Sequence, residues 1–114
     1  MSQILAKAGS VQERIEEMVR RIVSQFNPEK IILFGSHARG EAGPDSDVDL
    51  LVVMQPHGSK RERVVEVYGL LAGIGVPKDV MIVTPEEFEI YRDAPGTVIR
   101  TACREGKVLY DRAA

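Results

Sequence analysis

The chain has 114 residues, of which 44% are hydrophobic and 28% charged, as in folded globular domains and unlike disordered chains. Its net charge of −2 and pI near 5.7 argue against electrostatic binding of nucleic acid, which usually needs a basic excess. No apolar run approaches the roughly 18 residues that span a membrane, Met1–Ser10 lacks a signal-peptide core, and a single cysteine fits a reducing compartment. We therefore expect one cytoplasmic domain over residues 1–114, with no membrane or nucleic-acid partner.

The first predicted element is a helix over Val11–Phe26. Ser10 and Glu13 have the spacing of a capping box, in which each side chain accepts a hydrogen bond from a backbone N–H of the other residue. Apolar residues then recur at steps of three and four, which is typical of a helix with one buried face. Asn27-Pro28 should end this helix, because the residue before proline is pushed out of the α region.

Three apolar runs are interpreted as strands, and three further segments as helices. The strands are Ile31–Phe34, Leu50–Met54 and Val80–Val83, whose continuous apolar character favours central strands covered on both faces. The helices are Lys60–Ile74, a short one from Thr84 as N-cap through Tyr91, and Pro95–Arg104 with Gly106 as C-cap, before an extended tail at Val108–Tyr110. This alternation indicates a layered α/β or α+β domain.

The segment between the first two predicted strands carries the chemistry. Gly35-Ser36 follows a strand directly, where glycine permits a sharp turn and exposed N–H groups with the serine hydroxyl can hold phosphate oxygens. Asp47 and Asp49 stand two apart at the start of the next strand, so the pleat points both carboxylates to one face. Asp79 precedes the third apolar run at a comparable position.

Three clustered carboxylates favour a site for a divalent cation and a nucleotide. Neighbouring acids resist ionisation unless a positive charge lies between them, and Mg²⁺ prefers oxygen ligands together with substrate phosphates. The alternative for Asp45, Ser46 and Asp47 is a polar turn whose side chains cap nearby N–H groups. The strand context and Asp79 favour the metal–nucleotide site.

Gly35-Ser36, ten intervening residues and then Asp47-x-Asp49 resembles the signature of the DNA polymerase β-like nucleotidyltransferase superfamily. The fuller string Gly-Ser-x-Ala-Arg-Gly-Glu-Ala…Ser-Asp-x-Asp-Leu is similar to its minimal, single-domain branch, which includes the MntA-type antitoxins paired with HEPN-domain toxins. The resemblance implies a small mixed β-sheet flanked by helices over one minimal nucleotidyltransferase domain, residues 1–114.

The resemblance also implies a reaction and roles for the matching residues. The reaction is the Mg²⁺-dependent transfer of a nucleoside monophosphate from an NTP such as ATP, with release of pyrophosphate and with two metal ions. Asp47 and Asp49 would bind the metal ions, Asp79 would be the third acid and could take the proton of the acceptor hydroxyl, and Gly35 and Ser36 would hold the β- and γ-phosphates. Two ions roughly 3.5–4 Å apart suit such an in-line displacement.

Two side chains near the motif leave alternatives open. Arg39 keeps its place in the motif and either contacts phosphate or pairs with Glu41 or Asp45. Many relatives carry arginine where this chain has His37, so a phosphate contact by that side chain would be weaker and pH-dependent.

Three functions are compatible with this sequence. The first is transfer of AMP from ATP to a hydroxyl, expected to be a tyrosine, of a partner HEPN toxin, which the chain would thereby neutralise as its antitoxin. The second is a non-catalytic antitoxin that masks the toxin by binding. The third, disfavoured by the short chain, is a nucleotidyltransferase acting on a small molecule.

Overall fold

The computed structural model describes residues 10–55 and 57–114, so most of Met1–Ser10, where no signal peptide is predicted, lies outside the described residues. Four strands form one sheet in the order β3-β2-β1-β4. They are β1 (Lys30–Phe34), β2 (Val48–Val53), β3 (Lys78–Val83) and β4 (Lys107–Asp111). The described helices are α2 (Val11–Phe26), α3 (Ser36–Arg39), α4 (Lys60–Leu70), α5 (Pro85–Tyr91) and α6 (Val98–Glu105). β2 runs antiparallel to β1 and parallel to β3, which confirms the predicted mixed sheet flanked by helices.

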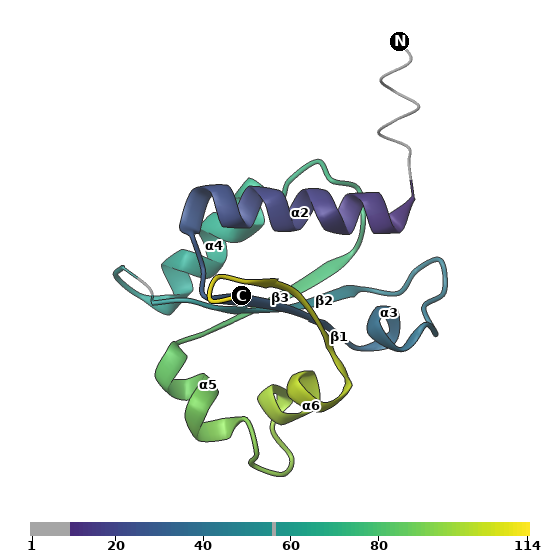
Figure 1. Ribbon diagram of the computed structural model, residues 1–114. Coiled ribbons are helices and arrows are strands. Elements are labelled where there is room, and N and C mark those ends of the chain that lie inside the picture. Colours follow the sequence, from purple (N-terminus) through teal and green to yellow (C-terminus); the bar gives the residue numbers. More distant parts are fainter. Residues whose placement is uncertain (1–9, 56) are drawn as a thin grey trace.

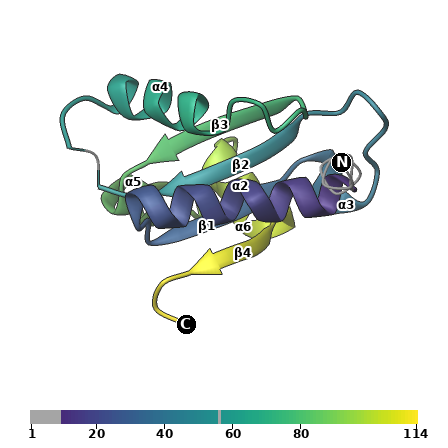
Figure 2. The same ribbon diagram turned by 90° about the horizontal axis from the view of Figure 1, so that it is seen from above.

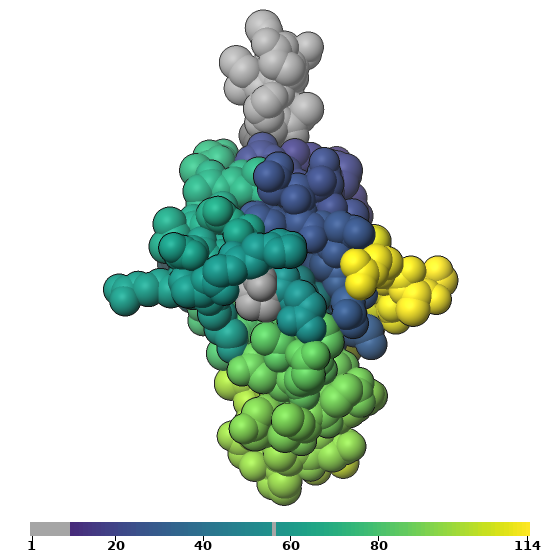
Figure 3. Space-filling view, turned by 90° about the vertical axis from the view of Figure 1, so that its left-hand side faces the viewer, coloured from purple at the N-terminus to yellow at the C-terminus, as the bar shows by residue number. Residues whose placement is uncertain are grey.

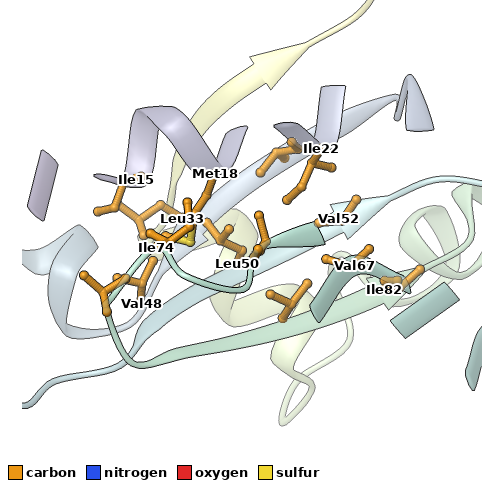
Figure 4. Close-up of a cluster of buried hydrophobic side chains, with 14 of the residues drawn as sticks. Ile15, Met18, Ile22, Leu33, Val48, Leu50, Val52, Val67, Ile74 and Ile82 are labelled. Atoms are coloured by element: carbon orange, nitrogen blue, oxygen red, sulfur yellow. The ribbon is translucent and has the colours of Figure 1, made fainter. Parts of the chain in front are cut away.

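The helices cover both faces of this sheet. α2 and α4 lie on one face and α5 and α6 on the other (Figure 1), and seen from above α2 lies over the middle of the sheet with α4 beside it near β3 (Figure 2). The larger apolar core fills the space under α2 and α4, where Met18, Ile22 and Val67 meet Leu50 and Val52 (Figure 4). A smaller core lies between the opposite face of the sheet and α5 and α6.

The predicted bounds of the first helix are confirmed. The Ser10 and Glu13 side chains form both bonds of the capping box. Asn27 ends the helix in a left-handed conformation, with φ 48° and ψ 57°, outside the right-handed α region as proline at the next position predicts. Asparagine tolerates this conformation, and its N–H donates to Val23 O at 3.0 Å. In the part of the chain that the structure describes, no helix combines the length and apolar character needed to cross a bilayer.

Two other predicted helices are shorter than expected. α4 ends at Leu70 and not at Ile74, because the chain turns over residues 71–74 while Leu71 and Ile74 remain buried. α6 begins at Val98 and not at Pro95, because the side chain of Thr97 accepts from the N–H of Arg100 and caps the helix there.

Two predicted extended segments also differ in their position in the sheet. The predicted tail after Gly106 is a true strand, β4, which pairs antiparallel with β1. The prediction of a central strand is wrong for β3, which has β2 as its one partner in the sheet. Asp79 and Met81 of β3 are therefore exposed on the face that also carries α5 and α6.

The sheet topology brings distant polar residues to one end of the molecule. The antiparallel pairing puts the last residue of β1, Phe34, opposite Asp49 in β2. The parallel pairing puts Asp79 of β3 on the other side of Asp49. α3 lies at this end (Figure 1), and in the view from the opposite end the C-terminal residues project from one side of the molecule (Figure 3).

Candidate active site

The turn after β1 is built around a close approach between Gly35 and Asp49. Gly35 has φ 76° and ψ −158°, a backbone conformation essentially restricted to glycine. A Cβ added there would collide with Asp49 Oδ2. Glycine is thus required twice, once for the turn and once for the space that the carboxylate occupies.

α3 starts directly after this glycine, where the sequence indicated a turn and not a helix. The N–H groups of Ala38 and Arg39 donate to Gly35 O at 3.1 and 3.2 Å. The first turn of a helix leaves its leading N–H groups, here those of Ser36 and His37, without intrahelical acceptors. These groups and the Ser36 hydroxyl are the predicted phosphate ligands, and they lie next to the close approach of Gly35 and Asp49.

The three predicted acids act on one another electrostatically. Asp47 immediately precedes β2 and Asp49 is its second residue, so Asp49 lies between Asp47 along the chain and Asp79 across the sheet. Partial burial raises the pKa of Asp49, and the charges of Asp79 and Asp47 raise it further, against smaller opposing effects of His37 and Arg39. The site therefore concentrates negative charge.

This donor set fits a hard divalent cation in its chemistry. All three donors are carboxylate oxygens, the ligand type that Mg²⁺ prefers, and a cation between them would relieve the repulsion that raises the pKa of Asp49. Among residues 10–55 and 57–114, no three His, Cys, Asp or Glu side chains form a ready-made metal cluster. The metal role of the three acids remains a prediction.

The loop from α3 to β2 is held by side-chain bonds. His37 Nε2 lies 3.2 Å from Ser46 O, and the N–H of Gly43 donates to Ser46 Oγ at 2.8 Å. Of the alternative polar turn over Asp45, Ser46 and Asp47, the structure thus contains a capping bond by Ser46. This loop ends at Asp47, which immediately precedes β2.

Arg39 is engaged with acids of this chain. Its Nε donates to Glu41 Oε1 at 2.9 Å, and Nη1 lies 3.5 Å from Glu105 Oε1 at the end of α6. The hydrogen bond with Glu41 is the largest cause of a raised pKa of Arg39. Of the two alternatives from the sequence, this structure contains the pairing with Glu41, so a phosphate contact would require Arg39 to leave these partners.

One polar side chain at the site was missed by sequence reasoning. The hydroxyl of Tyr68 in α4 accepts from the N–H of Val80 at 2.8 Å and lies 3.5 Å from Asp79 Oδ1. No spacing in the sequence connects Tyr68 with Asp79. The contact arises because α4 passes beside the outer edge of β3.

The carboxylates stand on an open surface. Asp47 and Asp79 are exposed and Asp49 is half-buried. Three surface cavities of about 380, 500 and 770 Å³ are lined by other residues. A bulky substrate can therefore approach the acids without entering a closed pocket.

Comparison of the sequence with known proteins gives two matches. The family model described as a nucleotidyltransferase domain matches residues 14–107. A candidate protein adenylyltransferase of Methanocaldococcus jannaschii is 43% identical over 44 residues, which are 37% of this chain and 44% of that protein. The chain thus matches less than half the length of this relative.

Comparison of the structure gives further matches. A candidate nucleotidyltransferase from Sulfolobus solfataricus is 22% identical, with a TM-score of 0.59, and the match covers 99% of this chain and 90% of that one. A toxin–antitoxin structure with AMP-PNP is 20% identical, with a TM-score of 0.61, and a mutant of the MntA–HpeT toxin–antitoxin is 18% identical, with a TM-score of 0.59. Each of these two matches covers 90% of this chain and 74% of the other. At these identities the likeness establishes a shared fold.

Proposed function

Because the chain belongs to the nucleotidyltransferase domain family, we propose that it transfers AMP from ATP to a hydroxyl group of a partner protein. One observation carries this proposal: Asp49 lies against Gly35 of the phosphate-binding turn and directly opposite Asp79. That arrangement brings the proposed phosphate-binding turn next to the proposed metal ligands. The family match over residues 14–107 also supports treating residues 1–114 as one domain.

The chain's own residues have separate roles in the proposed reaction. Ser36 and the N–H groups that follow Gly35 bind the β- and γ-phosphates, with Arg39 as a further phosphate ligand once it leaves Glu41. Asp47, Asp49 and Asp79 would hold Mg²⁺, and we propose two ions. When bound, Mg²⁺ supplies positive charge that neutralises the triphosphate and the pyrophosphate leaving group.

Asp79 is the residue best placed to receive the proton of the acceptor. It lies at the exposed edge of the sheet, whereas Asp49 lies inward against Gly35. An acceptor hydroxyl that approaches from solvent can reach Asp79 without passing Asp49. In the transfer, the acceptor oxygen bonds to the α-phosphorus, the bond from that phosphorus to the β-phosphate oxygen breaks, and the hydroxyl proton passes to Asp79.

A protein is the acceptor that this site supports best. The acids are exposed on an open surface, where the side chain of a folded partner can reach them. The Methanocaldococcus jannaschii relative is named as a candidate protein adenylyltransferase, and two structures of similar fold are toxin–antitoxin complexes. We propose that the partner is a toxin of the HEPN class, that the acceptor is a tyrosine, and that the modification neutralises the toxin.

A second candidate is an antitoxin that masks its toxin by contact alone. The toxin–antitoxin neighbours favour it, because a shared fold can serve binding as well as catalysis. The two candidates differ in whether Asp47 is required for neutralisation.

The proposal is tested by the intact mass of the protein encoded beside this one, after incubation with this chain, ATP and Mg²⁺. The expected result is a gain of one or more AMP units, absent with Asp47→Asn. A stable complex of unchanged mass, formed equally well by Asp47→Asn, would instead establish the masking antitoxin.

A further inference from the structure

The hydroxyl of Tyr68 lies between the backbone of β3 and the carboxylate of Asp79. It accepts from the N–H of Val80 at 2.8 Å, and its own proton points to Asp79 Oδ1 at 3.5 Å. The first bond fixes the oxygen, because a backbone N–H within a strand has little freedom to move. The second is at the long end of the hydrogen-bond range, as contacts of catalytic groups often are in free proteins before a ligand draws them together.

Tyr68 reaches Asp79 from the side opposite Asp49. Pro77 O, just before β3, accepts from the N–H of Val48, and Val83 O at the end of β3 accepts from that of Met54. Odd-numbered residues of β3 therefore direct their backbone groups toward β2. Even-numbered residues, Val80 among them, direct theirs to the open edge. The phenol therefore stands at the outer edge of the sheet, on the side of Asp79 away from Asp49.

The Tyr68 ring is partly buried. It packs against the larger apolar core from α4, two turns after a capping box formed by Ser59 and Glu62. Asp79, by contrast, is exposed on an edge strand, where its carboxylate has little packing to select one rotamer. A fixed donor beside a free carboxylate restricts the orientation of that carboxylate.

We propose that Tyr68 is a positioning residue, which orients the Asp79 carboxylate toward the cation and the acceptor hydroxyl. The inference rests on the proposed nucleotidyltransferase function and adds to it a residue on α4, outside the Gly-Ser and Asp-x-Asp motif. Tyr68 acts through Asp79 and does not touch the substrate. Hydrogen-bond partners of metal ligands typically contribute 10–100-fold to metal affinity or activity.

The first test compares Tyr68→Phe with Tyr110→Phe in adenylyl transfer to the partner protein. Tyr68→Phe keeps the packed ring and removes the hydroxyl. Tyr110→Phe is the control, because it removes a tyrosine hydroxyl from β4 at the opposite edge of the sheet. We expect Tyr68→Phe to lower kcat roughly 10-fold or more while KM for ATP changes less than twofold, and Tyr110→Phe to leave both unchanged. An unchanged kcat for Tyr68→Phe would overturn the proposal.

A second test needs no acceptor and so separates this inference from the proposed function. The affinity of the whole chain for Mn²⁺ is measured with a non-hydrolysable ATP analogue, in the wild type, Tyr68→Phe, Asp79→Asn and the double variant. Tyr68→Phe is expected to weaken Mn²⁺ binding about 10-fold in the wild-type background and to have no effect beside Asp79→Asn. Equal weakening in both backgrounds would show a general structural role and overturn the proposal.

An amide spectrum and a mass measurement complete the test. The amide signal of Val80 should shift and lose hydrogen-exchange protection in Tyr68→Phe, while the remaining amide spectrum keeps its dispersion, which shows that the variant is folded. If the wild type incubated alone with ATP and Mg²⁺ gained AMP on Tyr68, the hydroxyl would be an acceptor and not a positioning group, and the proposal would fail.

Discussion

At the scale of single residues, Asp49 is held where its charge is unfavourable. Burial and the neighbouring Asp79 and Asp47 raise the pKa of its carboxyl above the ordinary 3.8. The folded chain thus binds this proton more tightly than the unfolded chain does. The resulting contribution to stability is present below the ordinary pKa and is lost as the pH rises through the raised pKa.

Asp49→Asn should therefore stabilise the free protein at pH 7 while abolishing transfer. The gain should be modest, about 0.5 kcal/mol, because water screens a half-exposed carboxylate. It should shrink as the pH falls, because protonation then removes the charge of the wild-type carboxyl as well. Urea unfolding of both proteins at pH 7 and pH 4 measures this, and an Asn variant that is less stable at pH 7 would contradict it.

Gly35→Ala should remove activity as well as stability. The added methyl group collides with the Asp49 carboxylate and forces a backbone conformation that costs on the order of 1–3 kcal/mol. Gly40→Ala is the matched control, since Gly40 also has a positive φ, 74°, but open space around it. We expect Gly40→Ala to cost about 1 kcal/mol and to retain transfer, and Gly35→Ala to lose at least 100-fold in rate when measured on folded protein.

At the scale of elements, Gly106 is required by close packing and not by its backbone conformation. Gly106 joins α6 to β4 with an ordinary φ of −86°, so its conformation does not require glycine. A Cβ there would collide with Ala102 O of α6 and would lie 2.6 Å from Ile32 Cγ2 and 2.7 Å from Leu33 O of β1. The predicted C-cap is confirmed, but its physical reason is the close passage of the chain between the end of α6 and β1.

Gly106→Ala should accordingly destabilise the fold by about 1–3 kcal/mol, as overpacking does. Gly69→Ala should instead stabilise it by roughly 0.5–1 kcal/mol, because Gly69 lies within α4 with nothing near its missing Cβ. Thermal unfolding of the two variants and the wild type tests whether Gly106→Ala lowers the melting temperature and Gly69→Ala raises it. A stabilised Gly106→Ala would show that β4 does not dock on β1 as described.

The local signals in the sequence predicted individual elements well. The capping box and apolar stripe gave the bounds of α2, and Thr84 with Pro85 gave the start of α5. Short strands were predicted without their neighbours, so the edge position of β3 and the pairing of β4 were missed. Strand order depends on contacts between distant segments, which apolar runs alone do not specify.

At the scale of the whole molecule, the site is assembled from segments far apart in the chain. The sequence predicted that Gly35, Asp49 and Asp79 converge, and the strand register places them together. It did not predict that Arg39 meets Glu105 or that Tyr68 meets Asp79. Those contacts depend on how α6 and α4 lie against the sheet, for which the sequence contains no spacing signal.

Binding of Mg²⁺-ATP should raise the melting temperature of the whole chain. A ligand that binds only the folded state at about 100 times its Kd stabilises it by roughly 2.7 kcal/mol, or on the order of 10 °C for a domain of this size. We expect the full shift only when Mg²⁺ and ATP are present together, and a much smaller one in Asp47→Asn. The same shift in wild type and variant would place the nucleotide elsewhere on the molecule.

The central claim is that the chain transfers a nucleotidyl group, and the position of a radioactive phosphate tests it most directly. The chain, the protein encoded beside it and Mg²⁺ are incubated with ATP labelled at either the α- or the γ-phosphate. Label on protein from α-labelled ATP alone, lost in Asp47→Asn, is the result that we predict. Label from γ-labelled ATP would mean phosphoryl transfer, and label from neither would mean that the site does not act on this acceptor; either result would contradict the account.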